Sequence, residues 1–243
     1  MTDAGDVMTR KMQQMPLEMP FPKLQGRDDF IIGDCNRLAA AWINRWPDWP
    51  KPGHSLNLVG PAGAGKSHLA AIWQDMCGAR LCDHPAALAA IMTDANVPLV
   101  ILDKIDGAFD WPEDTLFHLF TRCDSQAGGI LMLSEQPVAQ MRWDLADLRS
   151  RMRGVAMASI DLPDDALVYA LLEKYFTDRQ LMAPPAMLTY LVSRMERSFH
   201  AVFKIAAMLD RRSIAEKKPL SVGLARLVLH DICLLYTSDA ADE

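Results

Sequence analysis

The most constraining feature of this chain is a glycine-rich segment at residues 60–67, Gly-Pro-Ala-Gly-Ala-Gly-Lys-Ser. It follows a short apolar run at 56–59 and opens a helical pattern that continues to about Cys77. The spacing G-x-x-x-x-G-K-[ST] between a strand and a helix is typical of a P-loop, whose backbone N–H groups surround a phosphate. The residues that we expect to bind a nucleotide there are Gly60, Pro61, Ala62, Gly63, Ala64, Gly65, Lys66, Ser67 and His68.

The residue types at the end of this segment indicate their chemistry. Lys66 can reach the β- and γ-phosphates, and the hydroxyl of Ser67 can bind Mg²⁺. A second Mg²⁺ ligand is predicted at Asp103, which ends the apolar run 97–102, as in a Walker B strand. The alternatives are a glycine-rich turn without a ligand, and an Asp103 that only caps a turn. The sequence leaves open whether ADP or ATP is bound.

Strand and helix patterns alternate in the first two thirds of the chain. Apolar runs typical of strands lie at 56–59, 79–82, 97–103, 129–134 and 155–160. After Asp164 only helical patterns follow, at 164–181, 185–196, 198–214 and 221–231. This order predicts an α/β domain with a parallel sheet at 30–162 and a small helical lid at 163–232. Residues 1–29 show no periodicity and are interpreted as an arm.

Composition narrows the class of protein. The formal net charge of −6 argues against a free-standing nucleic-acid binder, which is usually basic. No apolar run approaches the length of a membrane span, and the N-terminus lacks the apolar region of a secretion signal, so we expect a cytoplasmic protein without membrane contact. Five cysteines without framework spacing favour a reducing compartment. Cys77, Cys82 and His84 lie close in sequence, but buried structural thiols are favoured over a three-ligand metal site.

Two terminal segments have their own signals. In the arm, Pro16 and Pro20 favour an extended segment. It resembles the Q-L-x-L-x-L peptide by which bacterial replication proteins dock on the sliding clamp, and the matching positions are Gln14, Met15, Leu17 and Met19. A chance match is the alternative. Residues 233–243 resemble a translated sequencing adapter, so we expect them to be non-native and to lie outside the fold.

Taken together, these motifs resemble the AAA+ ATPases, and more narrowly the Hda family of DnaA-related regulators. The resemblance covers about residues 13–229. It is carried by the segments 14–19, 29–30 with Asn36, 46–49, 60–67, 148–151 and 209–214. It implies a protein that binds ADP or ATP with Mg²⁺, docks on the DNA sliding clamp and makes the replication initiator DnaA hydrolyse its ATP. Such a protein negatively regulates the initiation of DNA replication, with little direct contact to nucleic acid; a homo-oligomer is left open.

The resemblance also implies roles for single residues. Ser134 matches the sensor-1 position, and Arg151 in Leu-Arg-Ser-Arg-Met matches the box VII arginine finger that acts on a neighbouring molecule. His200 falls at the position of the sensor-2 arginine, and Arg197 is a substitute if both lie on one face of a helix. Lys104 stands where related initiators carry a second acid, so we expect weak ATP turnover by this chain itself.

Two other classes of protein fit parts of the pattern. A replication initiator or loader that acts directly on DNA should continue after the lid into a basic helix-turn-helix domain, whereas the resemblance ends near residue 229. A metabolic P-loop kinase lacks an evident acceptor site here and leaves Arg151 unexplained. The regulator is therefore the leading hypothesis, and the DNA-acting ATPase is the alternative.

Overall fold

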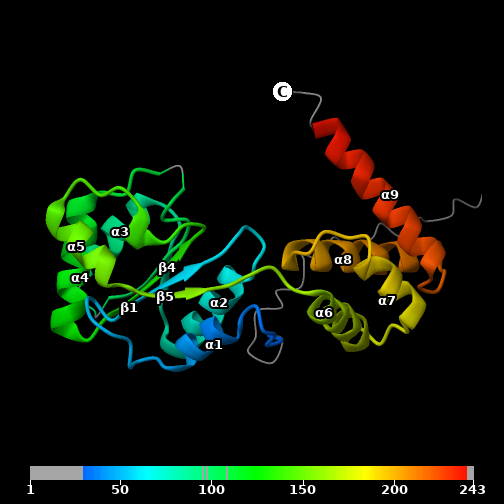
Figure 1. Cartoon of the computed structure of the whole chain (residues 1–243), viewed down its shortest axis with the longest axis horizontal. Helices are drawn as coiled ribbons and strands as arrows, with labels where there is room; N and C mark the ends of the chain where they lie inside the picture. Colours follow the sequence, from blue (N-terminus) through cyan, green and yellow to red (C-terminus); the bar gives the residue numbers. More distant parts are fainter. Residues whose placement is uncertain (1–29, 95, 97, 108, 240–243) are drawn as a thin grey trace, which may run out of the picture.

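The computed structural model describes residues 30–94, 96, 98–107 and 109–239, with side chains through Ile232. Its centre is a parallel five-stranded sheet in the order β2-β3-β4-β1-β5 (Figure 1). The strands are β1 (Ser55–Val59), β2 (Arg80–Cys82), β3 (Leu99–Leu102), β4 (Gly129–Ser134) and β5 (Ala156–Ser159). Every residue of β1 and β4 is buried, as expected for central strands that are covered on both faces.

Two layers of helices cover this sheet because alternate strand residues point to opposite faces. Ile101 and Leu131 pack with α1 (Arg37–Asn44) and α2 (Lys66–Cys77) in one core. The intervening residues, such as Val100 and Met132, pack with the helices of the second core. Those helices are α3 (Pro85–Met92), α4 (Glu113–Gln126) and α5 (Ala146–Gly154), with the short 3-10 turn η2 (Val138–Gln140) between β4 and α5.

A second, all-helical part follows β5 and has a core of its own. It consists of α6 (Asp165–Asp178), α7 (Pro185–Val192), α8 (Phe199–Glu216) and α9 (Val222–Asp239). Side chains cap three of these helices. Asp164, Ser198 and Ser221 accept hydrogen bonds from the backbone N–H groups of Leu167, Ala201 and Leu224, respectively. Figure 1 shows this part beside the α/β unit, on the side away from α4 and α5. The predicted α/β fold with a parallel sheet and a following helical lid is confirmed.

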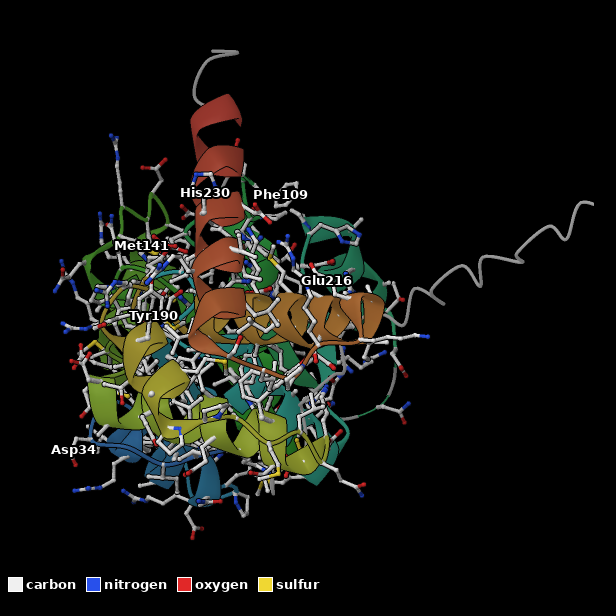
Figure 2. The ribbon with its side chains drawn as sticks, turned by 90° about the vertical axis from the view of Figure 1, so that its right-hand side faces the viewer. Asp34, Phe109, Met141, Tyr190, Glu216 and His230 are labelled. Atoms are coloured by element: carbon white, nitrogen blue, oxygen red, sulfur yellow. The ribbon has the colours of Figure 1, made fainter. Side chains whose placement is uncertain are left out.

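The last helix differs from the expectation at its C-terminal end. The pattern predicted a helix that ends near residue 231, with residues 233–243 outside the fold, whereas the backbone of α9 stays helical to Asp239. Leu224, Ala225 and Val228 anchor its first half in the lid core. Its second half projects beyond the other helices of this part, past the residue labelled His230 in Figure 2. None of the helices among the described residues is long and apolar enough to span a membrane.

Candidate nucleotide-binding site

The P-loop begins where β1 ends, and its backbone requires glycine at several positions. The N–H of Gly60 donates to the Ser134 carbonyl at 3.1 Å, and a Cβ on Gly60 would lie 2.3 Å from the Ile160 carbonyl oxygen. Gly63 and Gly65 have φ angles of 74° and 98°, in the region that favours glycine. The loop is thus held between the ends of β4 and β5 and leads directly into the N-terminus of α2, where the first N–H groups lack intrahelical acceptors.

Lys66 is the first residue of α2 and folds back over the loop. Its Nζ donates to the carbonyl oxygen of Gly60 and, at 3.0 Å, to that of Pro61. Burial lowers the pKa of Lys66, while the nearby carboxylate of Glu135 opposes that shift most strongly. Since both acceptors are carbonyls of the loop itself, this ammonium group can transfer its hydrogen bonds to a phosphate. Ser67 follows it, exposed on the first turn of the helix.

Acidic residues gather at the carboxyl edge of the sheet opposite Lys66. Asp103 directly follows β3 and is half-buried. Asp106 accepts hydrogen bonds from the backbone N–H of Glu135 at 2.6 Å and of Gln136 at 3.0 Å, which joins the loops after β3 and β4. Sequence reasoning missed Asp106 and Glu135, although each follows a predicted strand within four residues. Lys104 is exposed in the turn after β3, with a φ of 51°.

The hydroxyl of Ser134 is buried behind the P-loop. Its Oγ accepts a hydrogen bond from Asn57 Nδ2 at 2.8 Å, and the residue is 1% exposed. Asn57 also donates to the Met132 carbonyl at 3.2 Å and accepts the Val138 N–H at 3.0 Å. The predicted sensor position thus belongs to a buried polar network centred on Asn57. The signal that could have revealed Asn57 is that it is the only polar residue in the run 56–59.

The N-terminus of α8 closes over the P-loop from the lid. The Phe199 N–H donates to the Gly63 carbonyl at 3.0 Å, and a Cβ on Gly63 would lie 3.4 Å from the Cβ of His200. The structure therefore brings His200 to the loop, and its contact with a nucleotide stays a prediction. The expectation that Arg197 shares a helix face with His200 is wrong, because α8 begins at Phe199 and Arg197 precedes its N-cap. Arg197 instead forms two hydrogen bonds of 2.8 and 3.1 Å with Asp165.

Residues 30–36 lie between the two parts of the molecule. The ring of Phe30 contacts the ring of His68 on α2, with centroids 5.2 Å apart. Ile31 packs against the lid core, and the side chain of Asn36 fixes the turn by accepting the Gly33 N–H and donating to the Ile31 carbonyl. An apolar segment therefore lies beside the first turn of the P-loop helix.

Arg151 lies in the last turn of α5 and is held by α4. Its Nη1 is 3.0 Å from Asp124 Oδ2, and its Nη2 donates to Thr121 Oγ1 at 3.3 Å. Its guanidinium carbon lies 4.8 Å from the centre of the Phe117 ring. Figure 1 shows α5 at the opposite end of the α/β unit from α8. Arg151 is thus a fixed, partly buried arginine, and it is separated from the P-loop of its own chain.

The remaining predicted positions do not join this site. Gln14, Met15, Leu17 and Met19 lie outside the described residues, so the clamp-binding peptide stays a prediction. Cys82 is buried in the core, the Cys77 thiol donates to the Trp73 carbonyl at 3.1 Å, and His84 contacts Asp83. Within the P-loop, Pro61 and Ala62 are exposed and Ala64 is buried.

No protein-family model matches the chain, but its fold is shared with solved structures. Domain III of the replication initiation protein DnaA from Thermotoga maritima aligns with a TM-score of 0.67 at 17% identity, over 88% of this chain and 98% of that domain. A RuvB mutant from the same organism aligns at 0.65 and 15% identity, over 85% and 71%. AMPPCP-bound DnaA from Aquifex aeolicus aligns at 0.61 and 16% identity, over 81% and 71%. The chain therefore shares the AAA+ fold of DnaA domain III and RuvB, a parallel α/β domain followed by a helical lid.

Proposed function

We propose that this chain is a DnaA-related regulator that binds an adenine nucleotide with Mg²⁺ and stimulates ATP hydrolysis by the replication initiator DnaA. Docking on the DNA sliding clamp through residues 14–19 brings it to the replicating DNA. By converting the initiator to its ADP form, the protein negatively regulates the initiation of replication. Its fold, shared with DnaA domain III, and its P-loop support a nucleotide-binding protein of this type.

The observation that carries the regulatory part of this proposal is the position of Arg151. Its partner Asp124 also accepts the N–H of Gly53 at 2.8 Å, just before the amino end of β1. The P-loop starts at the other end of this strand, which spans about 16 Å for five residues. Arg151 therefore cannot contact a nucleotide on its own P-loop. If it acts on a phosphate, that phosphate belongs to another molecule.

An arginine is suited to that task. Its guanidinium is always charged and presents several N–H donors in one plane, which match the oxygens of a phosphoryl group. Arginines supplied by a partner in other phosphoryl-transfer systems accelerate hydrolysis by about 10³–10⁵. The neighbouring Arg149 donates to the Trp143 carbonyl at 3.3 Å, and Arg153 is exposed and forms no ion pair with any described side chain. Substitutions of Arg149 and Arg153 can therefore be compared with substitution of Arg151.

The chain's own nucleotide would be held by the P-loop and covered by the lid. Lys66 would contact its phosphates, and Ser67 and Asp103 would bind Mg²⁺, which neutralises charge on the phosphate oxygens when it is present. The structure of DnaA with AMPPCP favours an adenine nucleotide. Phe30, beside the first turn of α2, offers an apolar surface for the base. Since Lys104 cannot act as a water-orienting acid, we propose that turnover by this chain is slow.

The experiment measures hydrolysis of initiator-bound ATP with and without this protein, in the presence of clamp loaded on DNA. Stimulation by the wild-type chain is expected, and Arg151→Ala should remove nearly all of it while nucleotide binding and clamp binding persist. Arg153→Ala, on the same helix, is the matched control and should retain activity. Full stimulation by Arg151→Ala would contradict the assignment of the finger. Alanine at both Gln14 and Leu17 should abolish clamp binding and leave the fold intact.

The second candidate is an ATPase that acts directly on DNA. The structural neighbours favour it, since they include a DnaA bound to single-stranded DNA and the RuvB branch migration motor. This candidate predicts that the isolated protein binds single-stranded DNA and that DNA stimulates its own ATP hydrolysis. The regulator predicts neither, so one titration with DNA in the absence of the initiator separates them.

A further inference from the structure

Arg151 is held by three residues that lie on one stripe of α4. Phe117, Thr121 and Asp124 are spaced four and three positions apart, so their side chains project from the same face of the helix. They provide a ring, a hydroxyl and a carboxylate toward the same guanidinium. We call these three residues the α4 cradle.

The cradle fixes the plane of the guanidinium but leaves donors free. Asp124 and Thr121 take one N–H each from Nη1 and Nη2, and an arginine has five N–H donors in total. The ring of Phe117 contacts the guanidinium as a cation–π partner. The Arg151 side chain keeps 24% of its surface exposed. It is thus oriented on one side by its own chain, with donors left for an acceptor from another molecule.

Asp124 is itself held from a second direction. Its Oδ1 accepts the backbone N–H of Gly53 at 2.8 Å, while its Oδ2 receives Arg151 at 3.0 Å. A carboxylate that is bound through both oxygens cannot rotate freely. The contact with the loop before β1 therefore helps to fix the position of the guanidinium. An exposed arginine without such a partner would lose more side-chain entropy when it contacts a phosphate.

We propose that Asp124 is a positioning residue, which orients Arg151 for contact with the nucleotide of a partner molecule. This inference rests on the proposed function and adds the residue through which the finger is aligned. The ion pair lowers the net charge at the finger, but a misplacement of about 1 Å at a catalytic group can cost about 10²-fold in rate. Orientation therefore outweighs the shielding of charge, and loss of Asp124 should slow the stimulated reaction instead of accelerating it.

The test uses the full chain with the initiator, ATP and DNA-loaded clamp. Asp124→Asn keeps an oxygen for the Gly53 N–H and removes the charge that holds Arg151. We expect the maximal stimulated rate to fall by about 10- to 100-fold, with little change in the protein concentration that gives half-maximal stimulation. Asp114→Asn, an exposed acid in the first turn of the same helix, should leave both quantities unchanged.

A double-mutant cycle separates positioning from a structural role. In an Arg151→Ala background, Asp124→Asn should have no further effect on the stimulated rate, because there is no finger to orient. An equal loss in both backgrounds, or a wild-type rate for Asp124→Asn when Arg151→Ala is inactive, overturns the inference. Thr121→Val removes the other hydrogen bond that orients Arg151 and leaves the contact between Asp124 and Gly53 intact. It should slow the stimulated hydrolysis about fivefold. If the wild-type chain gives no stimulation, the proposed function itself fails, and this inference with it.

Discussion

Replacement of Asn57 by alanine should destabilise the α/β unit at a point directly behind the candidate nucleotide site. Asn57 is 1% exposed and joins β1 to β4 and η2 through three hydrogen bonds. Alanine removes the acceptor of the buried Val138 N–H, and an unsatisfied buried donor costs about 1–3 kcal/mol. The cavity left by the amide adds to this cost, so we expect the free energy of unfolding to fall by about 2–4 kcal/mol.

The loss of stability can be measured in the α/β unit itself, because all six tryptophans lie before residue 144 and so report on the unfolding of that unit. Trp49 and Trp73 stack at 4.9 Å within its core. Urea unfolding followed by tryptophan fluorescence should show the change in free energy, and the melting temperature should fall by about 5–15 °C. Gln140→Ala, an exposed substitution in η2, is the control and should unfold like the wild type.

Asn57→Asp tests the polarity of the same network. It keeps an acceptor for the Val138 N–H but places a carboxyl group against the Met132 carbonyl. Burial should raise the pKa of this carboxyl above its unfolded value, so the variant should be most stable at low pH and lose stability as pH rises through the folded pKa. For Asn57→Ala, a free energy of unfolding within about 0.5 kcal/mol of the wild-type value would show that the three hydrogen bonds of Asn57 do not contribute the stability assigned to them.

Three further predictions address the loop and the buried thiols. Lys66→Ala should weaken adenine nucleotide binding at least about tenfold by calorimetry, because it removes a charge-assisted contact to phosphate; unchanged affinity would contradict the P-loop assignment. Gly60→Ala should lower the melting temperature and abolish binding, since its Cβ would meet the Ile160 carbonyl oxygen at 2.3 Å; a wild-type melting curve would show that the loop can move aside. Burial raises the pKa of Cys82 to about 11 and of Cys123 to about 12, above the pKa of a thiol in the unfolded chain. The protonated thiols therefore contribute their full stability below about pH 8.5, and this contribution is lost as pH rises toward the pKa values of the folded state. Urea unfolding between pH 8 and 10.5 should therefore show a steeper loss of stability for the wild type than for Cys123→Ala, and equal slopes would refute this effect.

The elements of the fold could be predicted from the sequence because each has a local signal. The run 56–59 followed by Gly60 and Lys66 predicted strand, P-loop and helix, and the structure has β1 and α2 at those places. The change from alternating strands and helices to helices alone near Asp164 predicted the lid. Such signals depend on side-chain periodicity and on backbone conformations that few residues adopt, and both are properties of neighbouring residues.

The neighbours within the site were decided only by tertiary structure. The sheet order places β4 beside β1, with Ser134 opposite Val59, and this brings the loop after β4 to the P-loop. No pattern in the sequence records that order, because strand pairing depends on which segments pack best across long stretches of chain. Asp106 and Glu135 were missed for this reason, since they meet only after β3 and β4 pair.

The same distinction applies to two arginines, Arg151 far from the P-loop and Arg197 beside the helix that closes over it. Arg151 was identified from its motif, but its contact with Asp124, 27 positions earlier, exists only because α4 packs against α5. Arg197 was expected beside His200 from helical spacing, which failed because Ser198 caps α8 and starts the helix one residue later. The sequence by itself determined the glycine-rich loop between a strand and a helix, and the series of helices and strands. The tertiary structure decided which side chains face that loop and which are held away from it. Strand order, helix packing and the start of α8 set these positions, and all three depend on contacts that the local sequence pattern does not record.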